Sequence, residues 1–396
     1  MTETVQKRNL WLLVLAQSLG AASPPIIISL GGIVGQSLSG NPALSTLPVS
    51  LYQAGVALST IPAAILIRRL GRRMAYLIGA MAGLFSGLWA AWGISQGSFV
   101  DFCLGVALAG FYGACVQSYR FAAADAVSVA ARPRAISLIM VGGLIAAIIG
   151  PQVVIWTRDL LPGTPFAGSF YSQAALALLA IPVVLLLRMP AQQADSETDS
   201  GRPLGEIARS WSFIVAATAG VVSFGLMSFI MTAAPMAMVQ MGHSVDNAAL
   251  GIQWHVLAMF APSFITGRLI QAYGKATMTA AGLLLIAASA VVAIMGTGIP
   301  EFWGSLILLG IGWNFGFIGA TAMVTDCYED SERTKVQALN DFLVFGTVAV
   351  ASFGSGHLLN TAGWKAINIA MFPIVGVVLV MLLMQYLGMR RLRPQQ

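Results

Sequence analysis

The sequence predicts an all-α polytopic membrane protein with twelve transmembrane helices in two six-helix pseudo-repeats. Three observations predict this fold class: a shortage of charged residues, a series of long apolar runs, and turn sequences that recur in the second half of the chain. Charged residues make up only 9% of the 396 residues, and hydrophobic residues make up 57%. A soluble domain carries roughly a quarter charged residues, so this chain has too little charge to cover a surface that faces water.

The apolar runs have the length of membrane-crossing helices, which need roughly 20 residues to span the hydrocarbon core. Inside lipid, only helices and closed barrels satisfy the backbone internally, and these runs are much longer than barrel strands. We expect twelve spans, in order, at 10–36, 45–67, 74–95, 99–124, 135–157, 169–188, 212–240, 247–267, 276–296, 302–325, 336–359 and 364–388.

A polar stretch, MPAQQADSETDSGRPLGEIARSW, separates the sixth and seventh spans. Its content of Ser, Asp, Gly and Pro is typical of a flexible linker. We therefore divide the chain into an N-terminal six-helix bundle at 1–188, a cytoplasmic linker at 189–211 and a C-terminal six-helix bundle at 212–396.

The basic residues fall on one side of the predicted membrane, as the positive-inside rule requires. If the N-terminus is cytoplasmic, all 21 Lys and Arg lie in cytoplasmic segments except Arg120, Arg158 and Lys365. This asymmetry places both termini in the cytoplasm. The formal net charge of +6 therefore reflects topology and contact with anionic lipid head groups, and we expect no nucleic acid partner.

Two kinds of turn recur in the predicted halves. The stretches AILIRRLGRR and GRLIQAYGKA follow the second and eighth spans, and their alignment pairs Gly71 with Gly274. Asp125 and Asp326 follow the fourth and tenth spans, and two basic residues follow each of them at the same spacing. Two six-helix halves that repeat in this way are a known plan of secondary transporters, which bind their substrate between the halves.

Over essentially its full length, the chain resembles the major facilitator superfamily, whose members carry a G-x-x-x-D-R-x-G-R-R-type loop after the second span. The chain departs from this pattern, because Ala64 replaces the first glycine and Arg68 stands where the acid is expected. The resemblance implies the major facilitator fold and a transporter, not an enzyme. The sequence has no P-loop lysine and no G-x-S-x-G motif, so we expect transport that is driven by a gradient.

The methionines of the seventh and eighth spans suggest a metal site. Met227 and Met231 are four residues apart, as are His255 and Met259, so each pair shares a helix face. The two spans are antiparallel neighbours, and at about 1.5 Å of rise per residue the two pairs lie at similar depths. Thioether and imidazole ligands select Cu(I) over hard cations, which predicts copper bound by these four residues.

The motifs MSFIM and WHVLAM resemble the paired M-x-x-x-M and H-x-x-x-M of CcoA-like copper importers, the CalT family. The resemblance implies copper import across the bacterial inner membrane to supply cytochrome oxidase assembly, with the two pairs as ligands. Copper would be the transported substrate and not a prosthetic group, and periplasmic or cytoplasmic copper chaperones would be partners. Met236, Met238 and Met241 would line an entry path for the metal.

Other readings of these residues stay open. Methionine in a membrane helix is ordinarily a packing residue, and a membrane histidine often serves as an interhelical hydrogen-bond donor. Relatives on the same branch of the superfamily carry organic substrates, riboflavin among them, and a sensor or scaffold that does not transport is a third hypothesis. For an organic cargo, five residues would matter more than the methionines: Trp254, Trp313, Phe315, Tyr119 and Arg120.

Three charged residues are candidates for gating or coupling, namely Arg120, Asp125 and Asp341. Charged groups within membrane spans are functional candidates by default. Arg120 could pair with an anionic substrate or lock the two halves through hydrogen bonds. Asp341 could carry a coupling proton or pair with a basic loop.

Overall fold

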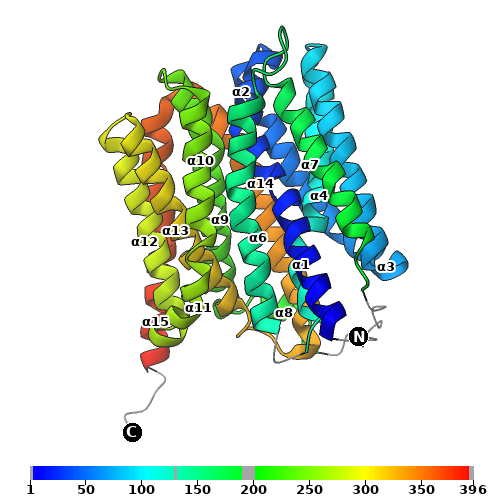
Figure 1. The fold of residues 1–396 in the computed structure, drawn as a ribbon. Coiled ribbons are helices and arrows are strands. Elements are labelled where there is room, and N and C mark those ends of the chain that lie inside the picture. The colour runs from blue at the N-terminus through cyan, green and yellow to red at the C-terminus, as the bar shows by residue number, and fades with distance from the viewer. Residues whose placement is uncertain (1–2, 129–131, 190–200, 392–396) are drawn as a thin grey trace.

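The computed structural model describes residues 3–128, 132–189 and 201–391 as a bundle of long helices (Figure 1). Within those ranges the chain forms helices, turns and loops, with no strand. α1 begins and α15 ends at the same end of the bundle (Figure 1). The predicted all-α class is therefore confirmed.

The N-terminal half is built from helices whose breaks coincide with Pro, Gly or Ser. Proline costs no hydrogen bond in the first turn of a helix, and α2 has proline at its first positions. The helices of this half are α1 (Glu3–Gly20), α2 (Ser23–Ser39), the short η1 (Pro42–Leu44), α3 (Leu47–Ser95), α4 (Phe99–Gln117), α5 (Tyr119–Asp125), α6 (Arg132–Thr157) and α7 (Ala167–Leu185).

The C-terminal half repeats this plan after a short connecting helix. Ser210 caps α9 by accepting from the Phe213 N–H, which satisfies one of the free donors at a helix start. The helices are α8 (Leu204–Ala208), α9 (Trp211–Gln240), α10 (Val245–Phe260), α11 (Ser263–Tyr273), α12 (Lys275–Met295), α13 (Ile299–Val324), η3 (Asp330–Glu332), α14 (Arg333–Ile369) and α15 (Met371–Arg391).

The apolar helices account for the twelve predicted spans. Within the described residues, 9 helical stretches are long and apolar enough to cross a membrane, and the bent pair of α10 and α11 makes up to 10. Two stretches, Pro42–Ser95 and Lys335–Gly388, have 54 residues each. A helix of that length extends ~80 Å, which is too long for one crossing. Each is broken by a glycine with positive φ, Gly71 at 78° and Gly363 at 82°, and counting each as two crossings completes the twelve.

The two halves meet near the end of the bundle opposite the termini (Figure 1). α6 packs on α10, and there Arg158 pairs with Asp246 at 2.7 Å. α14 packs on α3, and the side-chain amide of Asn360 donates to the Pro42 carbonyl at 2.9 Å. Polar contacts on two separate seams therefore hold the halves together at this end.

The turns that repeat in the sequence also repeat in the structure. Gly71 and Gly274 have positive φ values of 78° and 88°, a conformation that glycine adopts without steric cost. The residue after each glycine pairs with an aspartate. Arg72 pairs with Asp125, the last residue of α5, and Lys275 pairs with Asp326, which follows α13. The same loop architecture thus stands at the corresponding place in each half.

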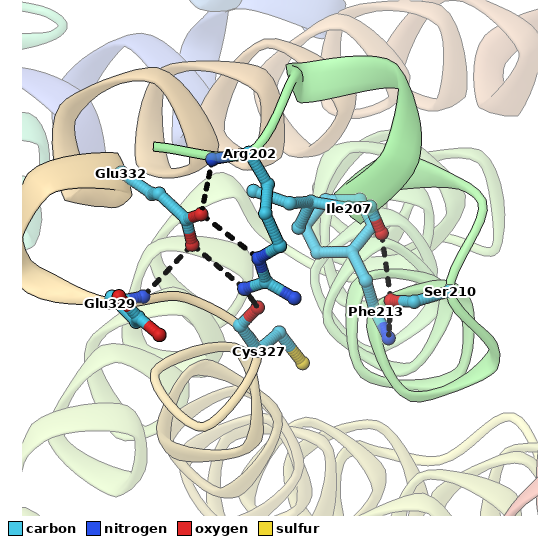
Figure 2. A network of polar contacts seen from close by, with 7 residues as sticks. All are labelled: Arg202, Ile207, Ser210, Phe213, Cys327, Glu329 and Glu332. Atoms are coloured by element: carbon cyan, nitrogen blue, oxygen red, sulfur yellow. Dashed lines mark hydrogen bonds and ion pairs between the residues drawn. The ribbon is translucent and has the colours of Figure 1, made fainter. Parts of the chain in front are cut away.

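The described part of the predicted linker, from Gly201 onward, docks on the C-terminal half (Figure 2). Glu332, at the end of η3, accepts hydrogen bonds from the Arg202 backbone N–H at 2.7 Å and from Arg202 Nε and Nη2 at 2.9 and 2.7 Å. Residues 190–200 lie outside the described residues, as does Arg393, which the charge pattern assigns to the cytoplasm. The domain boundaries at 1–188, 189–211 and 212–396 stay a prediction.

Candidate functional site

Five aromatic residues from four helices gather in the C-terminal half, and we call them the aromatic cluster. Phe224 of α9 is its centre, with ring centroids 5.3 Å from Trp313 and 5.0 Å from Phe317 of α13, and 5.9 Å from Phe345 of α14. Trp313 stacks on Phe317 at 5.4 Å, and Phe260 of α10 meets Trp313 edge-on at 6.3 Å. The α13 pair is local in origin, because residues four apart share a helix face.

The aromatic cluster lies on the side of the C-terminal half that faces the N-terminal half. Gly356 lies three turns beyond Phe345 on the same face of α14, and a Cβ on Gly356 would stand 2.2 Å from Thr46 Oγ1 of the N-terminal half. Asp341 lies one turn before Phe345 on that face. Asp341 and Arg120 of the N-terminal half are both exposed and interact electrostatically. One face of α14 therefore carries both Phe345 of the aromatic cluster and Asp341, and Asp341 interacts with Arg120 across the boundary between the halves.

The composition of this boundary suits a flat organic molecule without net charge. Aromatic rings bind planar heterocycles through stacked and edge-on contacts. Arg120 supplies N–H donors and Asp341 supplies carboxylate acceptors, and their charges cancel. Side chains of these types can stack on a planar ring system and form hydrogen bonds to polar groups attached to it.

An apolar hollow of about 380 Å³ between α9 and α14 is a separate feature. Its lining includes Leu339, Leu343 and Thr347, which share one face of α14. Phe345 and Asp341 project from the opposite face, given the helical repeat of 3.6 residues. The hollow therefore lies outside the boundary where the aromatic cluster and the two charges meet, and we do not assign it to the substrate.

The structure separates the aromatic residues that the sequence proposed for an organic cargo. Trp313 is in the aromatic cluster, but the ring that joins it on α13 is Phe317 and not Phe315. Tyr119 is fully buried in the core of the N-terminal half, 4.7 Å from the ring of Tyr76. Trp254 is 42% exposed, although both of its neighbours on α10 are buried. The four-residue spacing of Trp313 and Phe317 is a signal that sequence reasoning missed.

The predicted copper ligands lie in the buried core of the C-terminal half. Met227, Met231 and Met259 belong to one packed cluster, and each is at most 7% exposed. His255 is fully buried, and its Nδ1 donates to the Leu306 carbonyl at 2.7 Å. Its Nε2 has no hydrogen-bond partner among the described residues. That the side chains of these four residues converge on one point stays a prediction.

The other candidates lie in different places. Met236 and Met238 are buried, and Met236 lies beside Gly32 of α2, between the halves. Met241 is 39% exposed. Asp125 pairs with Arg72 and is not part of the aromatic cluster. The gating or coupling roles predicted for Arg120, Asp125 and Asp341 stay predictions.

The twelve apolar crossings that the described residues form, in two similar halves, are the plan of a secondary membrane transporter. The chain belongs to the major facilitator superfamily, whose family model matches residues 10–261 and 216–395. It is therefore a multi-pass membrane protein and a transporter, not an enzyme.

Two relatives match the chain almost from end to end. The riboflavin transporter RfnT of Brucella anthropi is 60% identical over 394 residues, which cover 99% of this chain and 98% of the relative. The uncharacterized MFS-type transporter YdeG of Bacillus subtilis is 29% identical, over 96% of this chain and 91% of the relative.

Solved structures share the fold at low sequence identity. A mutant of the nucleoside transporter NupG superposes with a TM-score of 0.71 at 16% identity, covering 95% of this chain and 99% of that one. A bacterial homologue of the human lysosomal transporter Spinster, in an inward-facing and unoccupied conformation, gives a TM-score of 0.68 at 14% identity, with coverage of 97% and 96%. At these identities the likeness concerns the fold alone.

The prediction of copper import for cytochrome oxidase assembly is wrong, and so are the copper ion and copper chaperones as partners. The finding that overturns it is the 60% identical relative, which is a riboflavin transporter. The physical reason is that the buried face of any membrane helix produces four-residue spacings, and methionine is a common packing residue on such a face. Two pairs on neighbouring helices therefore do not distinguish a metal site from a packed core.

Proposed function

We propose that this protein carries riboflavin, or a closely related uncharged flavin, into the bacterial cell across the inner membrane. The observation that carries the proposal is the 60% identity to a riboflavin transporter over 99% of this chain and 98% of the relative. The match extends over both halves of the chain.

The aromatic cluster supports a flavin as the cargo. Riboflavin joins a planar three-ring system to a chain of hydroxyl groups, and it carries no charge. Phe224 and the stacked pair of Trp313 and Phe317 offer rings that can pack against the three-ring system. Arg120 and Asp341 would then form hydrogen bonds with the hydroxyl chain or with the polar edge of the ring system.

The charge pattern and the seams support an orientation in the membrane and a path for the cargo. We place both termini in the cytoplasm, since the basic segments belong on that side. In this orientation the seam formed by Arg158 and Asp246 closes the face toward the outside. Riboflavin would enter when this seam opens, bind at the aromatic cluster, and leave to the cytoplasm as the halves rock about the site.

Uptake of radiolabelled riboflavin tests the proposal in bacterial cells that neither make riboflavin nor import it by another route. We expect the wild-type protein to restore uptake and Phe224→Ala to lower it about tenfold, because the variant removes the ring at the centre of the cluster. Trp254→Ala is the control, since Trp254 is not in the cluster, and uptake should stay within about twofold. The proposal would be refuted if cells that hold the wild-type protein in their membrane took up no riboflavin.

A further inference from the structure

Trp313 differs in its hydrogen bonding from Trp364, which is also buried, and from the partly buried Trp303. It is 8% exposed, and its indole Nε1 is inaccessible and has no acceptor among the described residues. In contrast, Trp364 Nε1 donates to the Ala293 carbonyl at 3.2 Å, and Trp303 Nε1 donates to the Asn247 carbonyl at 3.0 Å. Tryptophan N–H groups usually find a partner when buried, so the free donor of Trp313 calls for an acceptor that is not part of the protein.

The neighbouring rings fix the indole in place. Phe317 stacks on it with an interplanar angle of 14°, and Phe224 meets it edge-on at 83°. Phe260 covers a further side at 78°. Turning the indole toward an acceptor elsewhere would break these contacts. The N–H is therefore held in one direction before any substrate arrives.

We propose that the Trp313 N–H is the donor that recognises the edge of the substrate ring, by binding a carbonyl oxygen or an unprotonated ring nitrogen. The inference rests on the proposed function and names one contact within it. A flavin offers such acceptors along the polar edge of its ring system. Phe224 is half-buried and edge-on to both rings of α13, so a movement of this one ring would open a way to the donor while Phe317 stays stacked on the indole.

The consequence is a preference among planar molecules. Stacking alone accepts any flat ring of suitable size, whereas a buried donor disfavours a ring that leaves it without an acceptor. Trp313 is in this account a specificity-determining residue. Flat hydrocarbons and rings without an edge acceptor would bind more weakly than a flavin of the same area.

Two replacements of Trp313 test the contact in the purified full-length protein, with riboflavin binding followed by quenching of flavin fluorescence. Trp313→Phe removes the N–H and part of the ring. Benzothienylalanine at position 313 keeps the bicyclic shape and replaces the N–H with sulfur, so it removes the donor alone. We expect both to weaken riboflavin binding, the second by about 3- to 10-fold, the worth of one neutral hydrogen bond.

Trp364→Phe is the matched control, because the Trp364 N–H already donates within the protein. It should lower the unfolding temperature without changing riboflavin affinity. Benzothienylalanine at position 313 should leave the unfolding temperature of the substrate-free protein unchanged, since no internal bond is lost.

The result that overturns the inference is a benzothienylalanine protein that binds riboflavin as tightly as the wild type. In that case the wild-type protein still binds riboflavin, and the proposed function stands. Absence of riboflavin binding by the folded wild-type protein is a different outcome, and it would count against the proposed function itself.

Discussion

The side chain of Glu332 is only 1% exposed. Its carboxylate accepts hydrogen bonds from the linker and from its own loop. Arg202 donates to both of its oxygens, and the backbone N–H of Glu329 donates to Oε2 at 3.0 Å (Figure 2). The hydrogen bond from Arg202, followed by the one from Glu329, lowers the pKa of Glu332 from 4.5 to about 2. The end of the linker is therefore fixed to the C-terminal half by a charged contact.

This contact predicts an acid dependence of stability. Because the folded-state pKa of Glu332 lies below its ordinary value, the contribution is fully present above about pH 4.5 and is lost as the pH falls toward 2. We expect Glu332→Gln to lower the unfolding temperature in detergent at neutral pH, with the difference from wild type shrinking below pH 4.5. The exposed Glu206 of α8 serves as control, and a difference for Glu332→Gln that is constant from neutral pH down to acid would contradict the prediction.

The predicted copper ligands show what single residues in a sequence can and cannot tell. Met227 and Met231 do share a face of α9, as their spacing predicts, and the structure buries both. Burial of His255 was also predictable from its apolar surroundings. The cargo was not predictable from these residues, because a packed core and a soft-metal site place the same residue types on the same helix face.

At the scale of helices, the seam between α6 and α10 is the contact that has to open for a substrate from outside. Gln152 donates to Gln253 at 3.0 Å, and Arg158 pairs with Asp246 at 2.7 Å. The paired atoms Arg158 Nη1 and Asp246 Oδ1 are inaccessible to solvent. Breaking the pair leaves a partly buried charge without its partner, which favours the closed seam.

We expect Asp246→Asn to shift the protein toward the state that is open to the outside. The pair is worth about 1–2 kcal/mol after allowance for the 39% exposure of the Asp246 side chain, so the open fraction should rise about 5- to 30-fold. The measurement is the labelling rate, by an impermeant thiol reagent, of a cysteine placed at Gln253. Exchange of the two charges between Arg158 and Asp246 should restore slow labelling, and a rate that Asp246→Asn leaves unchanged would show that the pair does not close the seam.

The positions of the helices along the chain were predictable from the sequence. The rotation of each helix about its own axis, which decides the face that it presents to its neighbours, was not. Two breaks follow from residues that are visible in the sequence. α3 breaks at Gly71, since a positive φ favours glycine, and Pro262 lies in the break between α10 and α11, since proline lacks the N–H of a helix interior. The aromatic cluster draws on α9, α10, α13 and α14. Which faces of four helices meet depends on packing between segments far apart in the chain, and no local pattern encodes it.

For the whole molecule, the repeat of two halves explains how one site serves two sides of a membrane. Each half has the same loop after its second span, with a positive-φ glycine and a basic–acidic pair. Because the halves are similar, they can close on either side of a site that lies between them. In the proposed site, the aromatic cluster of the C-terminal half and Arg120 of the N-terminal half would both contact the cargo.

We propose that the cargo is an uncharged flavin and not a metal ion. Uptake into liposomes that contain only the purified protein distinguishes the two, with riboflavin and Cu(I) offered separately under reducing conditions. We predict saturable riboflavin accumulation that Cu(I) does not inhibit, and no copper accumulation above that of protein-free liposomes. Copper accumulation by protein that transports no riboflavin would show that the cargo is the metal and not the flavin.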